Sequence, residues 1–264
     1  MSYSNPRITN PATKFIEFKG DTGEFFYYDK DKEQKIQLKM PLYFIVLDEL
    51  STITGFNNRL GCGIYSNEIR NIKDEVLNVR SFKGGLSIIG KYQDIKDKIT
   101  SNGGKFCKSV YAMLITGKNQ YELVNFKFHG ASFGGVESGR SGWMQKKVNT
   151  EKYGVCVKEC EQGQTGSIHY MAPIFEGLNI NSSYDTAARN MDKELQKFLS
   201  YYFSQQVEKE VSELEPLEPE VIDENDPAGM GTFDKKEKMD VSDVTDLPFT
   251  FLLPIIGLGL SLFC

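Results

Sequence analysis

The stretch EFFYYDKDKEQKIQLKMPLYFIVL, residues 24–47, decides the fold class of this chain. Within it, apolar and polar residues alternate from Gln34 to Met40, so that every second side chain points to the same face. That period of two is typical of a β-strand with one buried face. The run Leu42–Leu47, which follows Pro41, is almost entirely apolar and predicts a buried β-strand.

Short apolar runs of the same kind recur on both sides of this stretch, separated by turn residues. They cover Thr13–Lys19, Glu24–Lys30, Gly63–Ser66, Val76–Phe82, Leu86–Ile89, Ser109–Ile115, Tyr121–Phe128, Gly154–Val157 and Ile168–Phe175. Between them, Tyr92–Ile99 has helical spacing and ends at a pair of glycines. Together with 24 glycines, this pattern predicts a mainly β domain over residues 13–181, preceded by a flexible lead at 1–12. The expected architecture is a small Greek-key β-barrel, OB-fold-like with long loops.

A single amphipathic helix is predicted to follow this domain, over residues 182–212. Ser182, Ser183 and Asp185 supply an N-cap and an early acid. The helix carries an apolar stripe at three- and four-residue steps, formed by Ala188, Met191, Leu195, Phe198 and Tyr202. Residues 213–249 are acidic, rich in proline and without periodicity, so we expect a disordered tail there.

The net charge of −5 averages two opposite regions. From Glu208 to Asp246 there are fourteen acidic residues and four lysines, which gives −10, whereas residues 1–207 carry 27 basic and 22 acidic groups, a net of +5. A basic body with an acidic tail is expected of a protein that binds a polyanion at one end only. An ordinary body with a solubilising tail has the same charges.

The five cysteines show no disulfide-framework spacing, and the N-terminal residues MSYSNPRITN hold no secretory signal. Both features favour a cytoplasmic protein.

The segment Asp243-Val244-Thr245-Asp246-Leu247-Pro248-Phe249 resembles the acidic tail of bacterial and phage single-stranded DNA-binding proteins, which closes in Asp-(Ile/Leu)-Pro-Phe. The run PLYFIVLDELSTITGF, which begins at Pro41, is also similar to such proteins of large tailed bacteriophages. The resemblance implies an OB-fold body that coats single-stranded DNA during replication, recombination or repair, in the host cytoplasm if the protein is phage-encoded. It also implies that the tail recruits a helicase, primase or polymerase. The implied partner-binding residues are Asp243, Asp246, Leu247, Pro248 and Phe249.

The chain departs from this family pattern because fifteen residues, TFLLPIIGLGLSLFC, follow the phenylalanine. Residues 247–264 carry no charge, which suggests either a membrane anchor or an extension of little functional meaning at 250–264. Eighteen residues with two prolines are short for a bilayer span, which takes about 20 apolar residues. Membrane attachment is therefore expected only if the extension is functional, and a homo-oligomer is left open.

Sequence-independent binding of single-stranded DNA needs aromatic faces for the bases and cations for the phosphates. The segment Phe25–Lys39 offers both, and leaves open which of its two tyrosines stacks on a base. Aromatic residues in β-strands more often belong to the core than to a ligand-binding surface. The prediction of a DNA-binding site therefore depends on the candidate residues as a group and not on any single one. The candidate DNA-binding residues are Tyr27, Tyr28, Lys35, Lys39, Arg80, Lys83, Lys105, Lys108, Tyr111, Lys127, Arg140 and Trp143.

Motifs for catalysis are scarce in the sequence. It contains no P-loop, no His-Glu-x-x-His and no zinc-type cysteine spacing, so a non-enzymatic protein without cofactor or metal is expected. The alternative is a metal-dependent nuclease, since Asp21, Glu33 and Lys35 fit the loose Asp…Glu-x-Lys signature. Short patterns of this kind often arise by chance.

Overall fold

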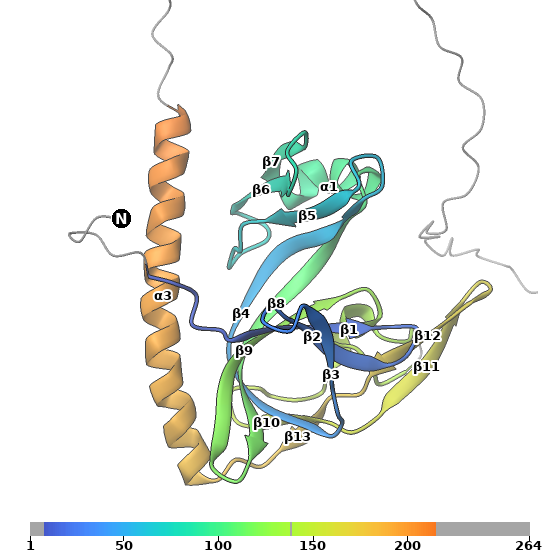
Figure 1. Ribbon diagram of the computed structural model, residues 1–264, viewed down its shortest axis with the longest axis vertical. Helices are drawn as coiled ribbons and strands as arrows, with labels where there is room; N and C mark the ends of the chain where they lie inside the picture. Colours follow the sequence, from blue (N-terminus) through green and yellow to red (C-terminus); the bar gives the residue numbers. More distant parts are fainter. Residues whose placement is uncertain (1–7, 138, 215–264) are drawn as a thin grey trace, which may run out of the picture. The chain divides into compact units, whose positions relative to one another are not determined.

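The computed structural model describes residues 8–137 and 139–214 (Figure 1). The chain divides into two units, Met1–Glu215 and Pro216–Cys264, and all described residues belong to the first. The expected partner-binding residues at 243–249, the acidic tail beyond Leu214 and the apolar extension at 250–264 lie outside the described residues. Within the described residues, no helix is both long and apolar enough to cross a bilayer.

The protein is mainly β with a C-terminal helix, as the sequence predicts. An eleven-stranded sheet contains the path β3-β2-β1-β9-β8-β4-β5-β6-β7, and β10 and β13 join it beside β4. All pairs in this sheet are antiparallel except β1 with β9. The strands are β1 (Lys14–Lys19), β2 (Glu24–Asp29), β3 (Gln34–Leu38), β4 (Leu42–Asn57), β5 (Cys62–Ser66), β6 (Val76–Ser81), β7 (Ser87–Lys91), β8 (Gly104–Gly117), β9 (Gln120–His129), β10 (Gly154–Val157) and β13 (Glu176–Leu178).

The remaining elements are one hairpin and four helical segments. The hairpin pairs β11 (Cys160–Thr165) with β12 (Ile168–Pro173) as a separate two-stranded sheet. The helical segments are α1 (Tyr92–Ser101), α2 (Ala131–Gly134), a 3₁₀ turn (Trp143–Gln145) and α3 (Ser182–Leu214).

The predicted barrel is wrong, because the sheet does not close: β3 and β7 end the path and do not pair with each other. The physical reason lies in β4, whose 16 residues extend over about 50 Å. Its beginning, Leu42–Phe44, pairs with β10, whereas its end, Thr54–Asn57, pairs with β5. The neighbouring β-strands therefore leave β4 at opposite ends and cannot meet to close a barrel.

Two apolar cores lie along the same side of β4 and β8. The first is centred on Phe44, Phe126 and Trp143, which are at most 1% exposed. The second lies in the upper lobe, which we define as β5, β6, β7, α1 and the adjoining ends of β4 and β8. There α1 buries Ile95 and Ile99 against the apolar side of these β-strands.

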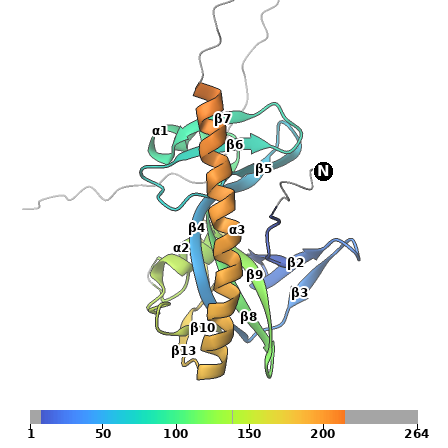
Figure 2. The ribbon, with the colours of Figure 1, turned by 90° about the vertical axis from the view of Figure 1, so that its left-hand side faces the viewer.

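The helix α3 packs on the opposite side of the sheet, alongside β4, β8 and β9 (Figures 1 and 2). Leu195, Phe198 and Leu199 contact Leu50 and Tyr111 there. The predicted apolar stripe is confirmed, since its members are buried or partly buried in contacts with this side of the sheet. The contacts of the apolar stripe do not extend to the upper lobe, where the same side of the sheet is left uncovered by them.

Candidate nucleic-acid interface

The uncovered surface is the side of the upper lobe that faces away from α1, which we call the open face. One row of paired residues crosses it from β8 to β6: Lys105 lies opposite Thr54, Thr54 opposite Tyr65, and Tyr65 opposite Arg80. Directly paired residues point to the same side of a sheet, so these four side chains share the open face. The intervening residues of the same β-strands, such as Ile64 and Val79, point into the core under α1.

Three aromatic rings project from the open face, and we call them the aromatic platform. Phe56 is 56% exposed, Tyr65 41% and Phe82 74%. The ring centroids of Tyr65 and Phe82 lie 4.7 Å apart with an interplanar angle of 32°. Large apolar side chains with this much exposure, gathered on one surface, are typical of a binding site rather than of a solvated face.

Gly63 allows the ring of Phe82 to lie directly on β5. A Cβ atom at Gly63 would stand 2.9 Å from Cδ2 of Phe82, which is closer than van der Waals contact allows. Phe82 is also tied to this position through its backbone, because its N–H donates to the carbonyl of Gly63 over 3.1 Å. The glycine thus places the most exposed ring of the platform next to Tyr65.

Cations surround the aromatic platform. Lys105 and Arg80 lie in the row described above, and Lys83 follows Phe82 in a turn that Gly84 and Gly85 form with positive φ. Lys83 and Lys105 are exposed and form no ion pair with another described residue. Rings that can stack on bases and ammonium groups that can meet phosphates are therefore combined on one surface.

A second group of predicted residues lies on the β2–β3 hairpin. Tyr28 is 55% exposed and lies opposite Lys35, whereas Tyr27 points to the other side and packs partly against the core. The structure therefore separates the two tyrosines, and only Tyr28 presents most of its ring to solvent. Lys39 is exposed just beyond the end of β3.

Two predicted residues are turned toward the first core instead. Trp143 is 1% exposed, stacks on Phe128 with centroids 4.7 Å apart, and donates from Nε1 to the Glu49 carboxylate over 3.3 Å. Lys108 lies 3.9 Å from the same carboxylate, with its side chain 22% exposed. Because the indole ring is enclosed, it is not available to a base, and we leave both residues out of the interface.

Tyr111 is buried and Lys127 is partly buried, and they hold the carboxylate of Glu68. Lys127 Nζ lies 2.6 Å from Glu68 Oε1, and the Tyr111 hydroxyl donates to Oε2 over 2.9 Å. Ser109 donates to Oε1 over 2.6 Å, and the N–H of Glu68 donates to the hydroxyl oxygen of Tyr202 in α3 over 2.7 Å. We call Glu68, Ser109, Tyr111, Lys127 and Tyr202 the Glu68 cluster.

The pKa values of the cluster follow from its burial. Burial alone would raise the pKa of the Glu68 carboxyl, but the charge of Lys127 and the three hydrogen bonds outweigh it and hold this pKa below its ordinary value of 4.5. Burial also raises the pKa of Tyr202 to about 12 and raises the pKa of Tyr111 further. Lys127 is therefore a structural counter-ion, which is already neutralised and not available to a phosphate.

Arg140 lies away from the open face, next to the β11–β12 hairpin. Its backbone N–H donates to the carboxylate of Glu161 in β11 over 3.0 Å, and its guanidinium lies 3.9 Å from Glu159. That ion pair is exposed, so Arg140 remains accessible, but the structure does not bring it together with the aromatic platform.

The structure does not bring together the residues of the nuclease alternative. Asp21 lies in the turn before β2 and Glu33 in the turn after it, at opposite ends of a six-residue β-strand that spans about 20 Å. The two carboxylates cannot bind one metal ion together, so the Asp21, Glu33 and Lys35 signature is not assembled. Elsewhere in the described part of the chain, no group of three or more His, Cys, Asp or Glu side chains is placed to hold a metal ion.

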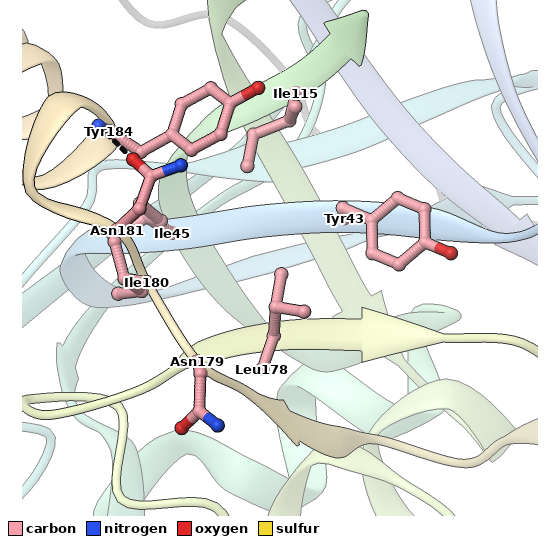
Figure 3. Close-up of a pocket in the computed structure, with 8 residues that line it drawn as sticks. All are labelled: Tyr43, Ile45, Ile115, Leu178, Asn179, Ile180, Asn181 and Tyr184. Atoms are coloured by element: carbon pink, nitrogen blue, oxygen red, sulfur yellow. Dashed lines mark hydrogen bonds between the residues drawn. The ribbon is translucent and has the colours of Figure 1, made fainter. Parts of the chain in front are cut away.

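A small pocket of about 230 Å³ lies where the chain enters α3 (Figure 3). Its lining is apolar and amide in character and consists of Tyr43, Ile45, Ile115, Leu178, Asn179, Ile180, Asn181 and Tyr184. The amide oxygen of Asn181 accepts a hydrogen bond from the N–H of Tyr184 over 2.9 Å and so caps the first turn of α3. No cation lines the pocket, so it offers nothing to a phosphate.

Phe56, Tyr65 and Phe82 were not among the predicted site residues. The signal for Phe82 was present in the sequence, since it lies between Arg80 and Lys83 in the run Val76–Phe82. Phe56 and Tyr65 could not be found in this way, because the sequence does not tell which side of the β4–β5 hairpin faces α1.

A scan of protein-family models and searches of curated proteins and of solved structures found no match to this chain.

Proposed function

We propose that this protein binds single-stranded DNA without sequence preference on the open face of the upper lobe. The observation that carries the proposal is the aromatic platform of Phe56, Tyr65 and Phe82, with the cations of Lys83 and Lys105 beside it. Bases stack on exposed aromatic rings with little regard to sequence, and cations along the platform compensate the phosphates. The net charge of +5 over residues 1–207 supports binding to a polyanion.

The proposed biological role is to coat single-stranded DNA during phage-type replication, recombination or repair, in the cytoplasm of the cell. The acidic segment that ends in Asp246-Leu247-Pro248-Phe249 then recruits a helicase, primase or polymerase. An acidic segment with an apolar tip suits this task, since its charges steer the encounter and its tip fills a pocket on the partner.

The DNA-binding proposal is tested by fluorescence anisotropy with a labelled thymidine oligomer of about 16 nucleotides. We expect affinity to fall steeply between about 50 and 200 mM salt, because each phosphate neutralised by the protein releases counter-ions. A duplex of the same length should bind much less tightly. Because Trp143 is enclosed in the core, the label must be on the DNA rather than in the intrinsic fluorescence.

The variant Phe82→Ala tests the site itself. It should lower the affinity about tenfold, since stacking on one aromatic ring contributes about 1–3 kcal/mol. Tyr153→Ala is the matched control, because Tyr153 is 44% exposed but lies in the loop before β10. If the two variants bind the oligomer as tightly as the native chain, the open face is not the DNA site.

Removal of the residues after Ser212 tests whether the tail takes part in DNA binding. The truncated chain should bind DNA as tightly as the full chain or more tightly, because a net charge of −9 is removed. Loss of DNA binding on truncation would show that the tail belongs to the binding site, contrary to the proposal.

A further inference from the structure

We propose that the DNA path continues from the aromatic platform across the same side of the sheet to the β2–β3 hairpin. The surface reached there, which we call the hairpin platform, consists of Phe15, Phe26, Tyr28 and Lys35. This inference rests on the proposed function and extends it, because it gives the protein two separate stacking surfaces and a minimum length of DNA that can use both.

The hairpin platform combines the same two chemical groups as the aromatic platform. Phe15 and Tyr28 are 48% and 55% exposed. Lys35 lies opposite Tyr28 across the hairpin, and its ammonium group stands over the ring of Phe26, 4.6 Å from the centroid. No described residue forms an ion pair with Lys35, so this cation is available to a phosphate.

The β-strand register places the two platforms on one side of the sheet. Phe26 lies opposite Glu17, and Glu17 opposite Lys127. Lys127 shares its side of β9 with His129, because the two residues are two positions apart. His129 in turn lies opposite Cys107 of β8. Cys107 is two positions from Lys105 on this β-strand, so it shares its side with Lys105 and the aromatic platform.

Lysines occur along the path as well as at the platforms. Lys105 marks one end, and Lys19 lies two residues beyond Glu17 on the same side of β1. Lys19 pairs with Asp21 over 3.3 Å, but both side chains are more than half exposed. Exposed pairs of this kind contribute little, so a phosphate can replace the carboxylate of Asp21 at small cost.

The helix α3 limits the path on its other side. It covers Leu50, Tyr111 and Leu123, which point to the same side of the sheet nearer to the beginning of β4. Figure 2 shows β5 and the β2–β3 hairpin on the same side of α3.

The spacing of the β-strands sets the length of DNA required. From β5 to β2 the sheet order counts five steps, which at about 4.8 Å each give about 24 Å. Stacked nucleotides rise about 3.4 Å each, so about seven of them cover this distance. An oligomer of about four nucleotides can therefore occupy one platform only, whereas one of about twelve reaches both.

The test uses anisotropy titrations of thymidine oligomers from about 4 to about 16 nucleotides, the range of site sizes known for single-stranded DNA binders. The native chain should show a step to higher affinity between about 6 and 10 nucleotides. The variants Tyr28→Ala and Lys35→Gln should remove most of this step, which lowers the affinity for the longest oligomers about tenfold. Tyr153→Ala and Lys118→Gln, two exposed residues away from both platforms, should keep the step.

Glu17→Gln gives a second reading of the path, because Glu17 is an exposed carboxylate between the platforms. It should raise the affinity for long oligomers about twofold and leave the shortest ones unchanged, since only long DNA passes over it.

The outcomes separate this inference from the proposed function. If Tyr28→Ala and Lys35→Gln keep the step while Phe82→Ala weakens all oligomers, the protein binds DNA on the aromatic platform alone and the two-platform path is wrong. If the native chain binds no oligomer, the proposed function fails and the path with it. Loss of the step in the hairpin variants alone supports the path.

Discussion

The aromatic platform and the Glu68 cluster contain the same kinds of residue and lie on the same side of β4 and β8, but they differ in their exposure to solvent. At the platform, Tyr65 and Lys105 are exposed and have no acidic partner in the described residues. At the cluster, Tyr111 is fully buried and Lys127 is bound to Glu68. The difference between them is coverage, because Tyr202 of α3 contacts the cluster whereas the rings of the platform are 41–74% exposed.

This difference shows what turns an aromatic–cationic pair into a binding surface. A lysine that is desolvated must have a carboxylate beside it, so coverage by a helix converts the pair into a structural ion pair. Where the cover ends, the same alternation of residues leaves rings and ammonium groups available to a ligand. Substitutions at both sites test this difference. Those in the Glu68 cluster should lower stability, whereas those at the aromatic platform should lower DNA affinity.

The largest effect is expected from Lys127→Ala. It leaves the Glu68 carboxylate buried without its cation and should lower the free energy of unfolding by about 3–5 kcal/mol. Urea unfolding measures this loss, and the folded variant should bind DNA with native affinity. Lys105→Ala is the control and should change stability by less than about 0.5 kcal/mol. If Lys105→Ala were destabilised and Lys127→Ala were not, Lys105 rather than Lys127 would have the structural role.

A smaller loss of stability is expected in acid. The pKa of Glu68 is lowered in the folded protein, so the unfolded chain binds more protons as the pH falls below 4.5. The stability from Glu68 is present above this pH and is lost as the pH falls through the lowered pKa. Unfolding free energies measured from about pH 6 down to pH 2 should decline more for the native chain than for Glu68→Gln. Parallel curves for the two proteins would show that Glu68 does not carry this dependence.

The next effect concerns the phosphates at the platform. Lys105→Gln removes one exposed cation and should lower the salt dependence of DNA binding, with a change in the slope of log affinity against log salt of about 0.7. The affinity should fall by a similar factor for every base composition, because a phosphate contact carries no sequence information. Lys118→Gln, in the β8–β9 turn, should leave the slope unchanged. An equal slope in both variants would remove Lys105 from the interface.

The smallest effect is expected from Gly63→Ala. The added Cβ meets the ring of Phe82 at 2.9 Å and forces this exposed ring to move away from β5. DNA affinity should drop about threefold, while thermal unfolding changes little because the displaced ring is largely in solvent. Gly61→Ala is not a suitable control, since its φ of +58° introduces backbone strain. Tyr153→Ala serves again, and a native affinity for Gly63→Ala would show that the position of the Phe82 ring is not important.

Much of the fold was predictable from residue alternation. Val76–Phe82 and Tyr121–Phe128 are observed nearly as expected, as β6 and β9, because each has one apolar and one polar side. The helix predicted at 182–212 is α3, which runs from Ser182 to Leu214. Its apolar stripe marked the buried face correctly because only one side of this helix meets the sheet.

The sheet topology was not predictable from the same pattern. The prediction ended the fourth β-strand at Leu47, whereas β4 continues to Asn57 through polar residues such as Asp48 and Ser51. Asp48 is satisfied by Arg70 and by Gln196 of α3, which are contacts from distant parts of the chain. Since the length of β4 separates the two halves of the sheet, its extension replaced the expected barrel by an open sheet.

The candidate site was predicted only in part, for a related reason. Alternation tells which residues share a side of a β-strand, but not which side a helix covers. Lys105 and Lys127 look alike in sequence, and so do Tyr28 and Tyr111. Contacts with Glu68 and with α3 enclose Lys127 and Tyr111, whereas Lys105 and Tyr28 are exposed.

Photochemical crosslinking of the full chain to a thymidine oligomer of about 16 nucleotides, followed by mass spectrometry of the linked peptides, identifies the residues that contact DNA. We expect crosslinks at Phe56, Tyr65 and Phe82, because bases stacked on these rings are in contact with them. Trp143 and Tyr111 should give none, since both are enclosed. Crosslinks confined to residues outside the open face and the hairpin platform would show that DNA binds elsewhere on the protein.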